Sequence, residues 1–447
     1  MEKTARGIAV TILNRIEQTN AFAEPLLDTY LSKDVLVTLQ DRRLLTQLVY
    51  GSLRMKNHLD WIIRSLYRGK PASLRTGVNN ILRVALYQLI YMDRIPAFAA
   101  VDEAVKLAKR NFSGSGSLVN AILRKALRNK NAFRFPDENH DPLQYLSIIH
   151  SHPEWMVARW LDRFGFEETK ALCTGNNGTP PITLRCNILK GSRDDILEQL
   201  LVEGSNATAA KYATSGILLT APSIPIARMP LFRQGFVQVQ DEASQLISHI
   251  VNPHREEIIL DVCSGTGIKS THLGELMKNR GRIIAVDVNP RKRTAAERLS
   301  ERMGVTIIET STKDATRDLG NDYHGLFDRV LVDAPCSGLG TVRRHPEIKW
   351  RLSEAGLRKG AIMQKSILHA AANYPKRGGI IVYSTCSTEP EENEAVIRNF
   401  LARHSDYMLA EPPKTIDRDM VTPDGFFRTY PHRHGTDGFF GAVLYRT

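Results

Sequence analysis

The chain is 447 residues long, which exceeds one ordinary domain and indicates two or three. Hydrophobic residues make up 42% of it, which excludes a compositionally disordered chain, and no apolar run is long enough to cross a bilayer. The formal net charge is +12 and the N-terminal residues lack the apolar run of a secretory signal, so we expect a basic, cytoplasmic protein without a membrane partner.

The positive charge is concentrated in the first third of the chain. Residues 1–140 contain 22 lysines and arginines against 12 aspartates and glutamates, whereas the remainder contains 38 against 36. Such a surplus is typical of a surface that meets a polyanion. A well-solvated basic surface has the same composition, and charge alone does not choose between the two.

Five cysteines, an odd number, occur without a secretory context, so we expect reduced thiols and no disulfide framework. The sequence has no Cys-x-x-Cys pair with a nearby His-x-x-x-His partner, so we expect no metal site. The cysteines are Cys173, Cys186, Cys263, Cys336 and Cys386.

An apolar period near 3.6 predicts short amphipathic helices over residues 42–50, 78–90, 101–110 and 118–128. Brief loops join them, which is typical of an all-α bundle. The polar, proline-containing residues 130–145 read as a linker. We therefore place a helical domain at residues 1–135.

A small α+β module is expected next, at residues 145–235. The pattern predicts a helix over residues 154–164 and another over 194–201. It predicts strands over residues 182–186 and 216–220.

Short apolar strands alternate with helices from about residue 240, which predicts an α/β domain at residues 236–447 with a doubly wound, mostly parallel sheet. Ligands of such sheets bind at the carboxyl ends of the strands. The expected strands are residues 258–262, 283–287, 305–308, 330–333 and 380–383.

A glycine-containing loop follows the first of these strands. Gly265 and Gly267 let the backbone turn tightly and approach a ligand closely. The helix after the loop offers unpaired N–H groups, which suit a carboxylate or a phosphate. The loop indicates a cofactor site made of Cys263, Ser264, Gly265, Thr266, Gly267, Ile268 and Lys269.

Aspartates follow the next two strands. Asp287 ends the second strand, where its carboxylate can accept hydrogen bonds from ribose hydroxyls. Asp314 follows the third strand and can meet an adenine amino group. A nicotinamide dinucleotide would use the same pair. Helix capping is the alternative reading, because Asn289-Pro290 opens the next helix.

Two cysteines follow the fourth and fifth strands, Cys336 after a proline and Cys386 after a threonine. A lone cysteine is usually an inert buried residue, but two in turns of small residues at strand ends indicate chemistry. Carbon 5 of cytosine attacks a methyl sulfonium only after a thiolate has added to carbon 6, and a carboxyl group at N3 eases that addition. Cys386, Asp333 and Cys336 match the thiol, the carboxyl group and the group that assists release. The base must be unpaired or flipped out of its stack.

Several runs resemble motifs of the RsmB (Sun/Fmu) family, bacterial enzymes that methylate carbon 5 of a cytosine in small-subunit (16S) rRNA. The helical N-terminal part resembles the antitermination factor NusB, and the middle module is similar to the family's RNA-recognition-like segment. The paired Pro-Cys and Thr-Cys motifs are those of RNA rather than DNA cytosine methyltransferases. The matching runs are residues 239–244, 261–269, 333–338, 343–350, 384–387, 391–393 and 437–440.

The resemblance implies three parts: an all-α NusB-like bundle that binds RNA, a small α+β module, and a Rossmann-like α/β class I methyltransferase domain. It implies S-adenosylmethionine as cofactor and 16S rRNA as partner, and we expect a monomer. Cys386 is then the nucleophile on carbon 6 and Cys336 assists elimination. Asp333 lies between cofactor and base, Asp287 holds the ribose and Asp314 holds the adenine side.

The cofactor loop departs from the family's pattern. The family usually has Cys-Ala-Ala-Pro-Gly-Gly-Lys, whereas this chain has Cys263-Ser-Gly-Thr-Gly-Ile-Lys269, so Ile268 replaces a glycine. Gly265-Thr-Gly267 resembles the more general loop of adenosylmethionine enzymes, and we expect cofactor binding to survive. Lys269 is expected near the methionine carboxylate or the base.

Basic residues after the Pro-Cys motif are candidates for phosphate contacts at the mouth of the active site, with a solvated loop as the alternative. They are Arg343, Arg344, His345 and Lys349.

Three other functions of the protein stay open. One is a tRNA or other-rRNA cytosine methyltransferase, and another is a non-catalytic RNA-binding or antitermination factor. The third is a dinucleotide oxidoreductase, which would share Asp287 but has no use for the two cysteine motifs.

Overall fold

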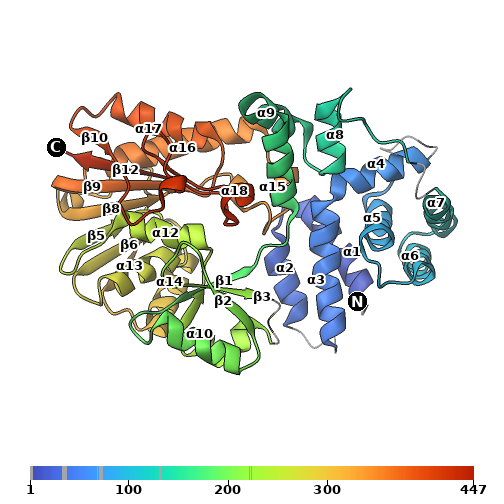
Figure 1. Ribbon diagram of the computed structural model, residues 1–447, viewed down its shortest axis with the longest axis horizontal. Coiled ribbons are helices and arrows are strands. Elements are labelled where there is room, and N and C mark those ends of the chain that lie inside the picture. The colour runs from blue at the N-terminus through green and yellow to red at the C-terminus, as the bar shows by residue number, and fades with distance from the viewer. Residues whose placement is uncertain are drawn as a thin grey trace. The chain divides into compact units, whose positions relative to one another are not determined.

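The computed structural model describes residues 4–32, 38–67, 69, 74–129, 133–220, 222 and 224–447 (Figure 1). The chain divides into two compact units, one of Met1–Gly178 with Val342–Arg351 and one of Thr179–Thr341 with Leu352–Thr447. Residues 130–132 of the expected linker lie outside the described residues, and the division into three domains stays a prediction. None of the described helices is long and apolar enough to span a membrane.

The first unit is helical, and the helices between residues 5 and 128 pack their apolar faces into one core. The predicted helices over residues 42–50, 78–90, 101–110 and 118–128 are confirmed within four of them. The helices are α1 (Ala5–Thr19), α2 (Ala23–Leu31), α3 (Leu39–Arg54), α4 (Lys56–Leu66), α5 (Thr76–Tyr91), α6 (Ala97–Asn111), α7 (Gly116–Arg128), α8 (Pro142–Ile149), α9 (Glu154–Asn177) and α15 (Ile348–Arg351).

Helix α5 is buried along most of its length and carries a charge into the core. The guanidinium of Arg83 donates to Asp60 of α4 at 2.7 Å and to Glu17 of α1 at 2.6 Å. A buried charge is tolerated only when it is paired. The three residues therefore join α1, α4 and α5 through their side chains.

A four-stranded antiparallel sheet in the order β2-β3-β1-β4 begins the second unit. The strands predicted over residues 182–186 and 216–220 are confirmed, as is the helix over 194–201. The sequence does not predict β2, which is small and polar, or β4, which has three residues. The elements are β1 (Ile182–Cys186), α10 (Arg193–Val202), β2 (Asn206–Ala209), β3 (Gly216–Thr220), α11 (Pro230–Arg233) and β4 (Val237–Val239).

A larger sheet in the order β10-β12-β9-β8-β5-β6-β7 forms the rest of this unit. Strands β5 to β9 pair parallel with one another, and β12 pairs antiparallel with β9, β10 and β11, so the predicted mostly parallel sheet is confirmed. The strands are β5 (Ile258–Asp261), β6 (Arg282–Asp287), β7 (Ile308–Thr312), β8 (Phe327–Asp333), β9 (Pro375–Thr385), β10 (Tyr407–Ala410), β11 (Phe427–Arg428) and β12 (Phe440–Arg446).

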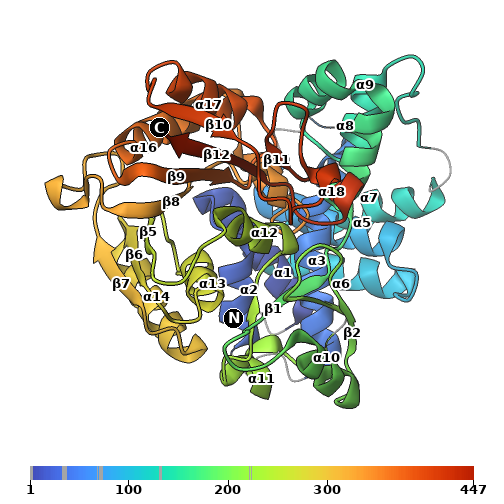
Figure 2. The same cartoon turned by 60° about the vertical axis from the view of Figure 1, so that its left-hand side comes forward.

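Helices cover both faces of the larger sheet (Figures 1 and 2). Helices α12 (Glu242–Val251), α13 (Ile268–Leu276) and α14 (Pro290–Met303) lie on one face, and α16 (Glu354–Ala371) and α17 (Glu394–Leu401) on the other. A short helix, α18 (Pro431–His434), precedes β12. Because both faces are covered, the ends of the parallel strands are where this sheet can offer polar groups to a ligand.

The third strand lies three to four residues later than predicted. Residues 305–308 were expected to be extended, but β7 runs from Ile308 to Thr312. Gly304 ends α14 in the left-handed conformation, and the Val305 N–H donates to the carbonyl of Ser300, which closes the helix. The apolar side chain of Val305 is therefore buried beneath the helix end and does not belong to a strand.

Candidate active site

The polar residues of the site follow the carboxyl ends of the parallel strands β5, β6, β8 and β9. Asp261, Asp287 and Asp333 are the last residues of β5, β6 and β8, and Cys386 follows β9 directly. Since β6, β5, β8 and β9 are neighbours in this order, the ends of four adjacent strands meet at one edge of the sheet.

The loop between β5 and α13 turns on two glycines with positive φ, 58° at Gly265 and 82° at Gly267. A Cβ on Gly267 would lie 2.9 Å from the Cβ of Ala296 in α14, so this position is closed to a side chain. A Cβ on Gly265 would meet nothing within 4 Å, so the backbone there is open to a ligand.

Asp287 is bound to this loop. Its Oδ2 accepts a 3.0 Å hydrogen bond from the Gly265 N–H, and its Oδ1 accepts one of 2.8 Å from the Asn289 N–H. Asn289 itself caps α14 by accepting from the Arg291 N–H at 3.0 Å. Capping therefore accounts for Asn289 but not for Asp287, whose carboxylate joins the ends of β5 and β6.

Asp314 lies two residues beyond β7 and is more exposed. Its Oδ1 accepts hydrogen bonds from the Thr316 hydroxyl at 2.7 Å and from the Thr316 N–H at 3.0 Å. These bonds lower the pKa of the carboxyl group. Asp314 therefore stabilises its own turn and keeps its other oxygen beside the more distant Arg317.

A buried acceptor lies beneath the loop. Asp261 is fully buried, and its Oδ2 accepts a 2.6 Å hydrogen bond from the Ser270 hydroxyl, whereas Oδ1 has no partner among the described residues. Burial raises the pKa of this carboxyl group to about 7. An open backbone at Gly265, a carboxylate at Asp287 and the start of α13 fit a ligand with ribose hydroxyls and a charged amino-acid end.

Lys269 and Asp333 form an ion pair between α13 and the end of β8. The ammonium group lies 2.6 Å from Asp333 Oδ2, and the Ser384 hydroxyl donates to Oδ1 at 2.7 Å. Burial disfavours the charge on Lys269, but the Asp333 carboxylate outweighs it and raises the pKa of the lysine. Both oxygens of Asp333 are thus held by donors.

The two predicted thiols are brought together. Cys336 Sγ and Cys386 Sγ lie 3.4 Å apart, within hydrogen-bond distance for sulfur. The hydrogen bond with Cys386, together with burial, raises the pKa of the Cys336 thiol well above its ordinary value. Either sulfur can donate the hydrogen bond, so the geometry places a thiol directly beside whichever sulfur carries the negative charge.

Sequence reasoning assigned no role to Glu392, which holds the loop of Cys336. Its Oε1 accepts from the Ser337 N–H at 2.8 Å and from the Gln364 side chain at 2.9 Å, and its Oε2 accepts from the Ser337 hydroxyl at 2.5 Å. Glu392 belongs to the run over residues 391–393 that resembles the family. The resemblance of this run to the family's motif is the feature of the sequence that could have identified Glu392 as a site residue.

The loop after Cys336 also packs against the start of β12. The Gly340 N–H donates to the Cys386 carbonyl at 2.9 Å, and its own carbonyl accepts from the Gly438 N–H at 2.8 Å. A Cβ on Gly340 would lie 1.8 Å from the Gly438 carbonyl oxygen. The glycine is therefore required for this close approach.

The expected phosphate contact is wrong for Lys349. This residue belongs to the helical unit, where its side chain is fully buried. Its ammonium group donates to the carbonyls of Ser151 at 2.7 Å and Arg54 at 2.9 Å and to the Asn177 side chain at 3.1 Å. Burial lowers the pKa of Lys349 well below its ordinary value. Arg343 is likewise buried, so this run is largely a structural segment.

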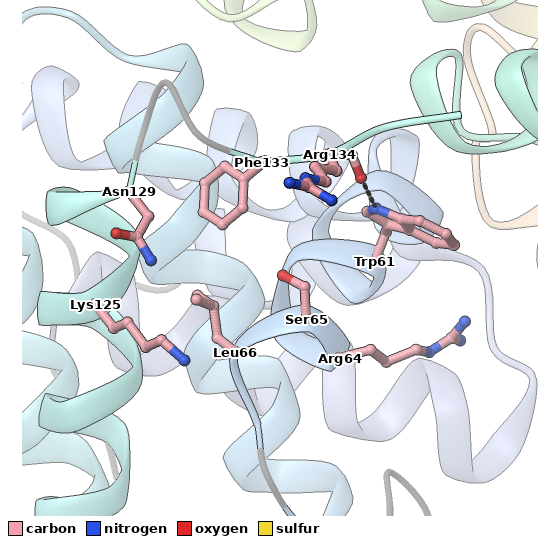
Figure 3. A pocket seen from close by; sticks show the side chains of 8 residues that line it. All are labelled: Trp61, Arg64, Ser65, Leu66, Lys125, Asn129, Phe133 and Arg134. Carbon is pink, nitrogen blue, oxygen red and sulfur yellow. Dashed lines mark hydrogen bonds between the residues drawn. The ribbon is translucent and has the colours of Figure 1, made fainter. Parts of the chain in front are cut away.

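The helical unit has a hollow of about 480 Å³ between α4, α7 and the residues that follow α7. Figure 3 shows Lys125, Asn129 and Phe133 on one side of it and Trp61 and Arg64 on the other. The Trp61 indole N–H donates to the Arg134 carbonyl at 3.3 Å. Among the described residues, the lining of the hollow combines aromatic rings and cations and includes no carboxylate: Trp61, Arg64, Ser65, Leu66, Lys125, Asn129, Phe133 and Arg134.

Three family models match successive parts of the chain. Residues 3–128 match the NusB family, residues 152–226 match an RsmF/B-like ferredoxin-like domain, and residues 248–445 match the 16S rRNA methyltransferase RsmB/F family. With the structure, these matches confirm the predicted fold class of a helical bundle, a small α+β module and an α/β methyltransferase domain.

Relatives of similar length match nearly end to end. The chain is 38% identical to a probable ribosomal RNA small subunit methyltransferase B of Bacillus subtilis, with 98% of both chains covered. It is 35% identical to the protein of the same name from Synechocystis, with 99% of both chains covered.

Solved structures agree. The protein PH0851 is similar over 100% of both chains, with a TM-score of 0.84 and 27% identity. NSun6 from Pyrococcus horikoshii with SFG shares the fold over 67% of this chain and 99% of its own, with a TM-score of 0.60 and 22% identity. The chain therefore belongs to the RsmB/F family of 16S rRNA methyltransferases, with a NusB-like N-terminal domain and S-adenosylmethionine as its cofactor.

Proposed function

We propose that this protein transfers a methyl group to carbon 5 of a cytosine in small-subunit (16S) rRNA through a covalent bond between Cys386 and carbon 6 of the base. The observation that carries the proposal is the 3.4 Å approach of the Cys336 and Cys386 sulfur atoms at the carboxyl edge of the sheet. The names of the relatives, which are small-subunit rRNA methyltransferases, support the substrate.

The reaction balances with these groups. The Cys386 thiolate adds to carbon 6, and the electron pair of the carbon 5–carbon 6 double bond becomes available at carbon 5. Carbon 5 takes the methyl group as the bond between that methyl group and the cofactor sulfur breaks, and the electron pair stays on the sulfur as a neutral thioether. Carbon 5 then loses its proton to a base, and the electrons of that C–H bond restore the double bond as the Cys386–carbon 6 bond breaks. The target base must be unpaired or flipped out of its helix to reach the thiol.

The two thiols have different tasks in this scheme. Cys386 is the nucleophile, and Cys336 donates a hydrogen bond to its sulfur, which stabilises the thiolate before addition and when it leaves. The 3.4 Å distance between the two sulfur atoms supports this pairing, because a Cys336 thiol can donate to a Cys386 thiolate across it.

Asp333 is proposed to meet the N3 edge of the cytosine and the amino group of the cofactor. Lys269 and Ser384 hold its two oxygens, so the carboxylate is oriented before the base arrives. Lys269 would also place a positive charge directly beside the group that meets the base.

The cofactor supplies an electrophilic methyl group on a sulfonium when bound. The loop from Cys263 to Lys269 would hold its amino-acid end, with the open backbone at Gly265 closest. Asp287 would accept from the ribose hydroxyls, and Asp314 would lie on the adenine side. Ile268 stands where the family has a glycine, but it is the first residue of α13 and lies after the two positive-φ residues, Gly265 and Gly267, so it needs no left-handed backbone.

The hollow of the helical unit is proposed as a contact for the RNA outside the target base. Aromatic rings such as Trp61 and Phe133 can stack on unpaired bases, while Arg64, Lys125 and Arg134 can meet phosphates. This proposal agrees with the surplus of lysines and arginines in residues 1–140, which is typical of a surface that binds a polyanion. We propose a cytoplasmic monomer that acts on this RNA.

The test uses tritiated S-adenosylmethionine and unmodified 16S rRNA with wild type, Cys386→Ala and Cys336→Ala. We expect methyl incorporation by wild type, none by Cys386→Ala, and a protein–RNA adduct that survives denaturing gels with Cys336→Ala. Incorporation into tRNA alone would move the substrate, and full activity of Cys386→Ala would overturn the covalent mechanism.

A further inference from the structure

A buried ion pair joins the small antiparallel sheet to the helix that begins at the cofactor loop. Arg185 lies in β1 and Glu275 in α13, and the guanidinium lies 2.7 Å from Glu275 Oε1. Both side chains are 0% exposed. Their place in the chain, 90 residues apart, makes this a tertiary contact and not a local one.

The same guanidinium reaches the first turn of α13. It donates to the main-chain carbonyl of Ile268 at 2.7 Å and to the Thr271 hydroxyl at 3.1 Å, and it also donates to Gln240 at 2.5 Å. Ile268 directly follows Gly267, the second glycine of the cofactor loop. Arg185 therefore holds the end of the cofactor loop by a hydrogen bond to Ile268, the residue that stands where the family usually has a glycine.

Other buried contacts tie the two sheets together around Arg185. The Asn187 side chain donates to the Met303 carbonyl at 2.6 Å and to the Gly235 carbonyl at 2.9 Å. Gly235 has φ 75°, and a Cβ there would lie 1.9 Å from the Arg302 carbonyl oxygen. The small sheet thus also holds the end of α14, on which Gly267 packs.

The Arg185–Glu275 pair is expected to contribute little to the free energy of unfolding. Arg185 Nε and Glu275 Oε2 are buried and have no hydrogen-bond partner among the described residues. A buried ion pair with unpaired atoms is often no more stabilising than apolar residues of the same volume. Its clearer structural effect is the position that it gives to the Ile268 carbonyl.

We propose that Arg185 is a positioning residue for the cofactor: by holding the first turn of α13 it sets the loop of Gly265 and Gly267, so the small module sets affinity for S-adenosylmethionine. This inference rests on the proposed function. It gives the module a task besides RNA recognition, because the backbone that meets the cofactor depends on a side chain from β1.

The test compares two double variants, because Arg185→Met alone would leave Glu275 as an unpaired buried charge. Arg185→Met/Glu275→Met removes the pair and its grip on Ile268. Arg329→Met/Glu257→Met is the matched control, since Arg329 lies 2.6 Å from Glu257 and donates to the Val251 carbonyl at 2.8 Å, away from the cofactor loop. The dissociation constant of S-adenosylmethionine is measured by calorimetry and the unfolding midpoint by circular dichroism.

We expect the first double variant to bind S-adenosylmethionine about tenfold more weakly, which corresponds to about 1.4 kcal/mol, while its midpoint stays within the range of the control. The control should bind like wild type. Equal affinity in wild type and Arg185→Met/Glu275→Met, or an equal loss in both double variants, would overturn the inference. Failure of wild type to bind S-adenosylmethionine would overturn the proposed function together with it, whereas binding without methyl transfer to rRNA would overturn only the proposed function.

Discussion

The ammonium group of Lys269 lies 2.6 Å from the Asp333 carboxylate, and this ion pair joins the end of the cofactor loop to the loop that carries Cys336. Lys269 donates to one oxygen of Asp333, and the Ser384 hydroxyl donates to the other. A single carboxylate therefore connects α13, β8 and β9.

We expect Lys269→Met to lower kcat for rRNA methylation by about tenfold to hundredfold, because an Asp333 carboxylate without its cation is poorly oriented toward the base. Lys376→Met is the control, since Lys376 pairs with Asp328 at the opposite end of β8. Single-turnover methylation with saturating cofactor measures the effect. Equal rates for both variants would contradict it.

The pH dependence of stability should carry the signature of Asp261. Burial raises its pKa from 3.8 to about 7, so the folded protein holds this proton more tightly than the unfolded chain. An acid with a raised pKa destabilises the fold as the pH rises from its unfolded pKa to its folded pKa, and the effect is constant above that. Asp261→Asn removes the effect.

The stability of Asp261→Asn relative to wild type should therefore increase by about 2 kcal/mol between pH 5 and pH 7 and level off near pH 8. Unfolding of the cofactor-free proteins at four pH values gives this difference. A difference that does not change with pH would show that Asp261 titrates normally.

Gly340 should tolerate no side chain. The Cβ of Gly340→Ala would lie 1.8 Å from the Gly438 carbonyl oxygen, so the loop must shift and the two thiols lose their alignment. We expect at least a tenfold loss of methylation. Gly356→Ala is the control, because that glycine is exposed in the first turn of α16 and its Cβ would meet only the Ser353 hydroxyl at 3.6 Å. Activity at the wild-type level in Gly340→Ala would refute the prediction.

Charge reversal in the hollow should weaken RNA binding and make the remaining affinity less dependent on salt. Arg64→Glu and Lys125→Glu each remove a phosphate contact, so the slope of log affinity against log salt should fall by about one per residue. Lys106→Glu is the control, because Lys106 already pairs with Asp102 and Glu103. Titration of labelled 16S rRNA fragments at several salt concentrations tests this. Slopes that match wild type would place the RNA elsewhere.

The sequence predicts the parallel strands well because each ends where an acidic or small residue follows an apolar run. It also predicts that Cys336 and Cys386 meet, since the strands before them can be neighbours at one edge. The prediction fails at Val305, whose apolar side chain serves a helix end, and at Lys349, whose partners lie in residues far away in the chain. Periodicity reports burial but not the contact that causes it.

Glu392 and Arg185 show the second limit. Each is a charged residue that the local pattern would leave in solvent, and each becomes buried because a distant segment supplies its partners. Their positions follow from how β1 packs against α13 and how η5 (Pro390–Glu392) faces α16, and no spacing within one segment carries that information.

The helical unit is discontinuous along the chain, since Val342–Arg351 completes it after more than 160 intervening residues have formed another unit. Ribosomes make proteins from the N-terminus, and domains usually fold as they emerge. Here the carbonyls of Arg54 and Ser151 accept hydrogen bonds from the Lys349 ammonium group, which is synthesised much later. The nascent helical unit therefore lacks this donor until most of the other unit has been synthesised. A single cut cannot divide this protein into two complete folding pieces.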